Sequence, residues 1–74
     1  MNRYLVWLAD YRGRSGAVIV ESFSLANAAT AFYRTLIESQ PGSARIQGES
    51  LDDGTVRAFD LSTRSQIICE EANP

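Results

Sequence analysis

The 74-residue sequence contains no histidine and no lysine, and Cys69 is its only cysteine. Without histidine, the chain lacks an imidazole base near neutral pH and the side chain that most often binds metals. Without lysine, it can form neither a Schiff base nor a Walker-type phosphate loop. A single cysteine excludes a disulfide within one copy and a cysteine-based zinc cluster. We therefore expect no catalytic residues, no metal site and no cofactor, and so not an enzyme.

The length of the chain predicts one domain, residues 1–74. A domain of this size buries only about 60% of the surface that its unfolded chain exposes, so its stability is marginal. The hydrophobic fraction of 45% is typical of a globular protein. We expect the core to come from residues 3–61 and the tail, residues 62–74, to be partly ordered.

No hydrophobic run is long enough to cross a bilayer or to act as an export signal. The longest candidate, Tyr4–Ala9, is interrupted at Asp10. Together with a single free thiol, this predicts a cytoplasmic protein.

Charge is unevenly distributed along the chain, although the net charge is only −2. All seven basic residues are arginines. Residues 1–37 carry four of them against Asp10 and Glu21, a net charge of +2. Residues 38–74 carry three arginines against seven acidic residues, a net charge of −4. The second half of the chain is therefore acidic.

Two strand pairs are predicted from branched and aromatic runs that flank turn residues. The first pair is residues 4–11 and 17–22 around a turn with two glycines, and the second is residues 44–51 and 55–61 around Asp52-Asp53-Gly54. Gly48 weakens the third strand or marks a bulge. Ile67–Cys69 could add a short edge strand.

A helix is predicted between the two strand pairs. Ser24 is a suitable N-cap, and an apolar stripe follows at helical spacing. The helix should end near Ser39 or Gln40, because Pro41 disfavours the α conformation in the residue before it. The stripe consists of Leu25, Ala29, Phe32 and Leu36, widened by Ala28 and Ile37.

These elements predict an α+β fold in the order ββαββ. A single antiparallel sheet of four strands, or five with the edge strand, carries one helix on one face. The strand faces could be inverted, because both are apolar near the strand centres. The residues expected between helix and sheet are Val6, Leu8, Val18, Val20, Leu25, Ala29, Phe32, Leu36, Ile46, Val56 and Ala58.

The other face of the sheet would remain uncovered by the helix, and exposed apolar patches usually mark interfaces. The C-terminal segment, a second copy or another protein could cover it. Trp7, Tyr11 and Phe59 are the candidates for an aromatic anchor or a dimer seam. The apolar residues expected on this face are Leu5, Trp7, Ala9, Tyr11, Ile19, Phe59 and Leu61.

Four acidic residues lie on or near the second strand pair: Glu49, Asp52, Asp53 and Asp60. They are either a solvated turn with solubilising charge or a surface that competes with nucleic acid for a basic groove on another protein. Direct nucleic-acid binding is a third hypothesis, because Trp7, Tyr11 and Phe59 could stack on bases beside nearby arginines. The net acidity and the absence of lysine count against it.

The order of elements resembles a group of small proteins from phages and mobile elements. The resemblance rests on the turn predicted at residues 12–16, the strand predicted at Val18–Ser22 and the helix start predicted at Ser24–Ala29. Across residues 3–61 the order is similar to that of several anti-CRISPR inhibitors of multi-subunit surveillance complexes. This resemblance implies a stoichiometric inhibitor in a bacterial host cell that blocks a nucleic-acid-binding groove or a subunit interface. The alternative hypothesis is a self-associating structural or regulatory module.

Overall fold

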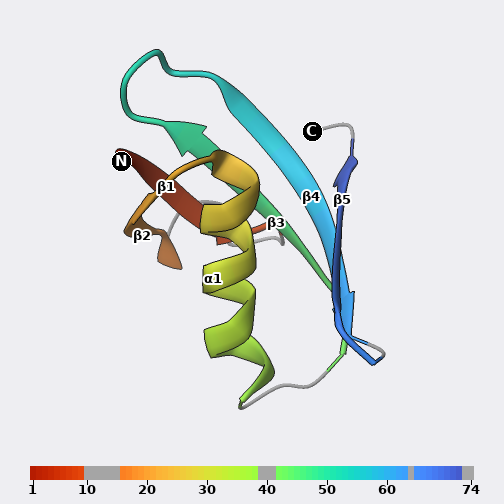
Figure 1. The fold of residues 1–74 in the computed structure, drawn as a ribbon. Helices are drawn as coiled ribbons and strands as arrows, with labels where there is room; N and C mark the ends of the chain where they lie inside the picture. The colour runs from red at the N-terminus through yellow and green to blue at the C-terminus, as the bar shows by residue number, and fades with distance from the viewer. Residues whose placement is uncertain (10–15, 39–41, 64, 73–74) are drawn as a thin grey trace.

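The computed structural model of the protein describes residues 1–9, 16–38, 42–63 and 65–72. It contains β1 (Asn2–Leu8), β2 (Val18–Ser22), α1 (Leu25–Ile37), β3 (Ala44–Ser50), β4 (Val56–Thr63) and β5 (Ile67–Ala72). The predicted α+β fold and its ββαββ order are confirmed, and the C-terminal edge strand is present as β5 (Figure 1).

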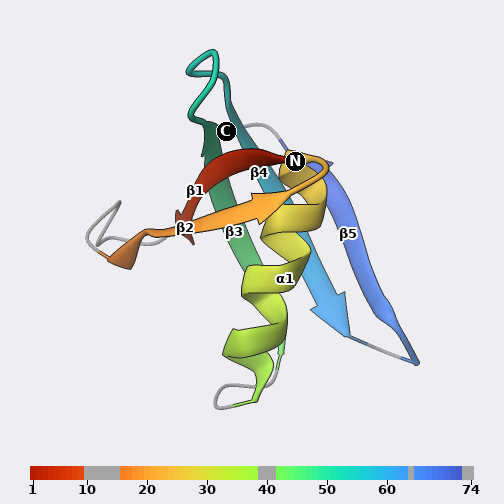
Figure 2. The same cartoon turned by 60° about the vertical axis from the view of Figure 1, so that its left-hand side comes forward.

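The strands form one five-stranded antiparallel sheet in the order β2-β1-β3-β4-β5. Both predicted hairpins are present, β1 with β2 and β3 with β4, and β1 joins them by pairing with β3. The helix lies across one face of this sheet, and the sheet curves around it (Figures 1 and 2). We call the opposite face the outer face. The edge strands are β2 and β5.

Helix α1 begins where the sequence predicts, because the Ser24 side chain accepts a hydrogen bond from the Asn27 amide at 3.1 Å. It ends at Ile37, and the predicted end at Ser39 or Gln40 lies outside the described residues. Its buried residues are Leu25, Ala28, Ala29 and Tyr33, whereas Phe32, Leu36 and Ile37 are only partly buried.

Tyr33 is the core residue that the predicted apolar stripe omitted, and it is only 1% exposed. Its hydroxyl donates a hydrogen bond to the Gly42 carbonyl and lies 2.9 Å from the Thr63 hydroxyl. A tyrosine can be buried in this way because its ring is apolar and its polar end is satisfied. The helix therefore turns Tyr33 towards the sheet.

The faces of β4 are the reverse of those predicted. Phe59 pairs with Ile46 and Leu61 with Ala44, which places both on the helix side, in the hydrophobic core. Val56 and Ala58 alternate with them and therefore lie on the outer face. Both sets of residues are apolar, so the alternation along β4 could not show which set faces the helix. The pairing of β4 with β3 determines it.

Val18 and Gly48 also differ from what the sequence predicted. Val18, the first residue of β2, is 43% exposed and is not part of the core. Gly48 marks no bulge, because the pairing of β3 with both neighbours continues through it without interruption. Instead, a Cβ at Gly48 would lie 2.5 Å from Leu25 Cδ1. The glycine is thus needed for the close approach of α1 to β3.

Among the described residues, no helix has the length and hydrophobicity required to cross a membrane.

Candidate partner-binding surface

The turn between β3 and β4, residues Leu51–Thr55, projects beyond the rest of the sheet (Figure 1). We call it the hairpin tip. The Ser50 amide donates to the Thr55 carbonyl at 2.9 Å, and the Gly54 amide donates to the Ser50 carbonyl at 2.8 Å. Gly54 has a φ of 76°, a conformation that glycine adopts without steric cost. The tip is therefore a defined turn on a continuous strand pair.

The two aspartates of the hairpin tip, both exposed, have different roles. Asp53 Oδ1 accepts a hydrogen bond from the Thr55 amide at 2.9 Å, and this bond lowers the pKa of Asp53 below its ordinary value of 3.8. Asp53 thus helps to hold the turn. No hydrogen bond or ion pair joins the Asp52 carboxylate to any other residue that the structure describes. Asp52 is available to a partner.

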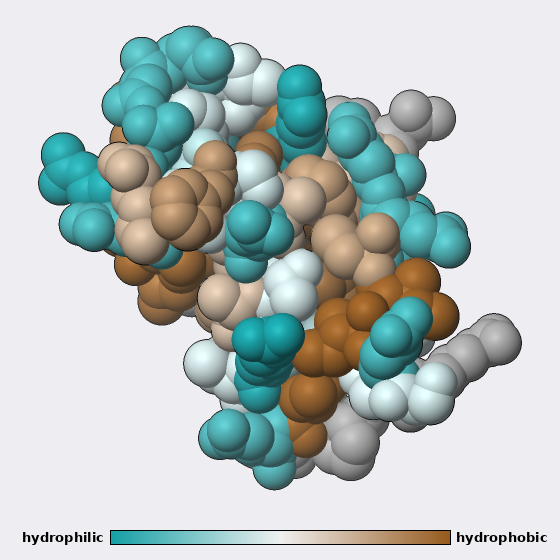
Figure 3. All heavy atoms as spheres, in the orientation of Figure 1, coloured by the Kyte–Doolittle hydropathy of each residue, from teal (hydrophilic) through white to brown (hydrophobic). Residues whose placement is uncertain are grey.

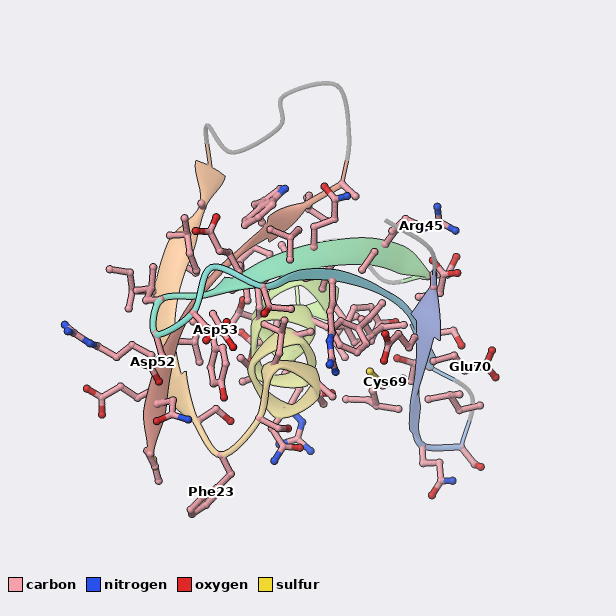
Figure 4. All side chains as sticks on the ribbon, turned by 90° about the horizontal axis from the view of Figure 1, so that it is seen from above. Phe23, Arg45, Asp52, Asp53, Cys69 and Glu70 are labelled. Atoms are coloured by element: carbon pink, nitrogen blue, oxygen red, sulfur yellow. The ribbon has the colours of Figure 1, made fainter. Side chains whose placement is uncertain are left out.

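Asp60 does not belong to the hairpin tip. It lies near the other end of β4, where Arg45 Nε donates to Oδ1 at 2.8 Å and Arg45 Nη2 donates to Oδ2 at 3.2 Å. Both side chains are about half exposed, at 50% and 51%. Glu70 lies directly opposite Asp60 on β5. Figure 4 shows Asp52 and Asp53 on one side of the molecule and Arg45 and Glu70 on the other.

The Asp60–Arg45 pair predicts a measurable pH dependence. Hydrogen bonds from Arg45 lower the pKa of Asp60 below its ordinary value of 3.8. The pair therefore stabilises the fold above about pH 4, the pKa of an unfolded aspartate, and this contribution is lost as the pH falls through the folded-state pKa. An NMR titration of the Asp60 carboxyl should have a midpoint below 3.8. In Arg45→Gln the midpoint should rise; an unchanged midpoint would contradict the assignment.

Glu49 lies on the outer face of β3, in register with Leu5 and Val56, and is half-buried. The four acidic residues therefore do not form one cluster. Asp52 and Asp53 share the hairpin tip, Glu49 lies near that end of the sheet, and Asp60 is bound to Arg45 at the far end. Two acidic residues not included in the prediction, Glu70 and Glu71, lie on β5, and Glu71 is 3.9 Å from Arg57.

Two of the three residues of the expected aromatic anchor, Trp7 and Phe59, are buried. Phe59 is 3% exposed and packs on the helix side, so its predicted place on the outer face is wrong. Trp7 is on the outer face but is also only 3% exposed, and its indole Nε1 donates to Gln47 Oε1 at 3.0 Å. Tyr11 lies outside the described residues. The rings of Trp7 and Phe59 therefore present little surface for base stacking or for a partner.

Among the described residues, the exposed aromatic one is Phe23, in the link between β2 and α1, at 75% exposure. An apolar residue before an N-cap often packs on the fourth helical residue, which here is Ala28. The sequence therefore provided no reason to expect that Phe23 is exposed. A hollow of about 320 Å³ separates it from the hairpin tip. The residues lining it include Tyr4, Phe23, Leu25, Asp52, Asp53 and Arg57.

Acidic and apolar side chains lie next to each other at the end of the molecule that carries the hairpin tip. Figure 3 shows hydrophilic side chains over the hairpin tip and hydrophobic ones over the neighbouring β2. Leu51, within the tip, is itself exposed. An acidic tip beside apolar side chains combines charge for orientation with apolar area for affinity.

No group of three or more potential ligands gathers as a metal site in the part of the chain that the structure describes. The sequence matches no protein-family model, no curated protein and no solved structure.

Proposed function

We propose that this protein is a non-enzymatic inhibitor that binds another protein by inserting the hairpin tip into a basic groove. The observation that carries the proposal is the Asp52 carboxylate, which projects at the end of a defined hairpin without a partner among the described residues. A carboxylate in that position can accept charge-assisted hydrogen bonds from arginine or lysine.

The hairpin is suited to this role because its geometry is set before binding. β3 pairs on both sides, with β1 and with β4, and Asp53 fixes the turn through the Thr55 amide. Ordering a flexible loop would reduce affinity, whereas a preformed turn avoids much of that entropy cost. Leu51 within the hairpin tip and Phe23 across the hollow from it add exposed apolar area.

The kind of partner follows from the charge and from the resemblance. A groove lined by basic residues is the form that nucleic-acid-binding proteins present to phosphates, and an acidic hairpin can compete for it. The order of elements across residues 3–61, which resembles that of several anti-CRISPR inhibitors, supports a CRISPR surveillance complex in the cytoplasm of a bacterial host as that partner. Inhibition by occupation requires no reactive group, which agrees with a chain that has no histidine or lysine.

Asp52→Arg is the substitution that tests the proposal. The partner is first captured from the native host on immobilised protein, identified by mass spectrometry and purified. Asp52→Arg should then weaken binding to it by at least about tenfold, because an attractive contact becomes a repulsive one. The partner should release bound nucleic acid when the wild-type protein is added, and not with the variant. Calorimetry and a mobility-shift assay measure the two effects.

Glu38→Arg is the matched control. It makes the same change in net charge at the exposed C-terminal end of α1, at the other end of the molecule from the hairpin tip (Figure 1). Its affinity should equal that of the wild type. Equal affinities for all three proteins would refute the acidic insertion. The double change Asp52→Arg with Asp53→Arg is a less direct test, because it also removes the hydrogen bond to Thr55.

A self-associating module is the second candidate function. The observation that favours it is the exposed apolar edge of the sheet at β2.

A further inference from the structure

One side of the β2 backbone pairs with none of the described residues, and the alternation of hydrogen bonds shows which of its groups lie there. The Arg3 carbonyl accepts from Leu51 at 3.2 Å and the Ala9 amide donates to Arg45 at 2.9 Å, so the odd-numbered residues of β1 direct their backbone groups to β3. The even-numbered Tyr4 and Val6 then direct theirs to β2, where they pair with Val20 and Val18.

It follows from this alternation that Ile19 and Glu21 direct their amides and carbonyls away from the sheet. Among the residues that the structure describes, none pairs with β2 on that side. Such a row of free donors and acceptors is a template for pairing with another extended strand.

The free edge at β2 carries few of the features that prevent such pairing. Natural edge strands are protected by lysine, proline or bulges. β2, with the sequence VIVES, has none of them and only one charged residue, Glu21. Ile19 is 59% exposed and Val18 is also exposed, so apolar side chains flank the free backbone. The other edge, β5, differs in that it carries two adjacent acidic residues, Glu70 and Glu71.

We propose that β2 pairs with β2 of a second copy of this chain, antiparallel across a two-fold axis, to give one continuous sheet. The axis passes beside Ile19. In that register Ile19 faces its own counterpart on the outer face, and Val18 faces the counterpart of Val20 on the helix side. Cross-strand pairs of branched apolar residues stabilise a sheet. A register centred on Glu21 would instead place two carboxylates directly opposite each other, which is destabilising.

A second copy of the chain is the partner of β2, because the free edge of β2 is complementary to itself and a two-fold contact gives a closed dimer. A two-fold contact uses both β2 edges, so only the two β5 edges remain, and each carries Glu70 and Glu71. Pairing of β2 with β5 would not close and would extend into a fibre; it is disfavoured because both strands carry acidic residues. The dimer also extends the buried surface of a domain whose own core is small.

The expected result is a dimer at micromolar concentration by sedimentation equilibrium. Ile19→Lys should raise the dimer dissociation constant by at least about tenfold, because burial of two isoleucines is lost and charges are introduced at the axis. Its far-UV circular dichroism should stay unchanged, since the Ile19 side chain points away from α1. Ala31→Lys, which adds the same charge on the exposed side of α1, is the control and should dimerise like the wild type.

Amide hydrogen exchange of the wild type tests the register without any variant. The amides of Ile19 and Glu21 should exchange more slowly as the dimer forms, whereas those of Val18 and Val20 should be protected in both states. Three results would each overturn the proposal: a monomer at all concentrations, a dimer unaffected by Ile19→Lys, or a dimer in which the Ile19 and Glu21 amides exchange rapidly.

Discussion

Replacing Tyr33 with alanine is expected to lower the free energy of unfolding by about 3–5 kcal/mol, the usual cost of truncating a large buried aromatic residue. The ring is 1% exposed and belongs to the core between α1 and the sheet. The hydroxyl joins three parts of the fold, because it bonds to the Gly42 carbonyl before β3 and to Thr63 at the end of β4. Since small domains have little stability to lose, a large fraction of the variant should be unfolded at 37 °C.

Tyr33→Phe is the matched variant, because it keeps the ring and removes only the hydroxyl. Its expected cost is about 0.5–1.5 kcal/mol, the range of a typical hydrogen bond. Urea denaturation followed by the fluorescence of Trp7 measures all three proteins. If Tyr33→Ala and Tyr33→Phe were equally destabilising, the ring would not be the core element that its burial indicates.

Replacing Gly48 with valine is expected to destabilise the fold by about 1–3 kcal/mol, the usual cost of overpacking. The direction of this stability change is informative, because in an ordinary strand replacing glycine with valine adds β propensity and should stabilise the fold. Here the new Cβ would lie 2.5 Å from Leu25 Cδ1 and 3.1 Å from Val6 Cγ1. Gly48→Ala should cost less, because it adds only the Cβ and the terminal carbon of Leu25 can move aside, whereas valine adds two further methyl groups to the same space.

Two comparisons separate this steric effect from a general loss of glycine. Gly16→Ala should change stability by less than about 0.5 kcal/mol, because a Cβ there meets no atom within 4 Å. In a double-mutant cycle, Leu25→Ala should cost less in the Gly48→Val protein than in the wild type, because truncation of Leu25 makes room for the valine. Thermal unfolding by circular dichroism measures each. A Gly48→Val protein as stable as the wild type would contradict the close approach of α1 to β3.

The partner-binding surface was predictable only in part. The Asp52-Asp53-Gly54 signal correctly predicted an acidic turn, because that turn chemistry is local. The division of roles between Asp52 and Asp53 was not predictable, because it depends on which carboxylate reaches the Thr55 amide. Nor could the sequence show that Arg45 binds Asp60, since only the register of β3 with β4 makes them neighbours.

Although the sequence left the C-terminal edge strand open, it determined by itself two hairpins and a helix with its Ser24 cap. These features depend on residues close together in the chain. Only the tertiary structure decided which face of β4 is buried, that Tyr33 enters the core and Trp7 is covered, and that β2 is left as an open edge. The physical reason is that both faces of the strands are apolar, so pairing between distant strands, and not alternation within one, selects the buried side.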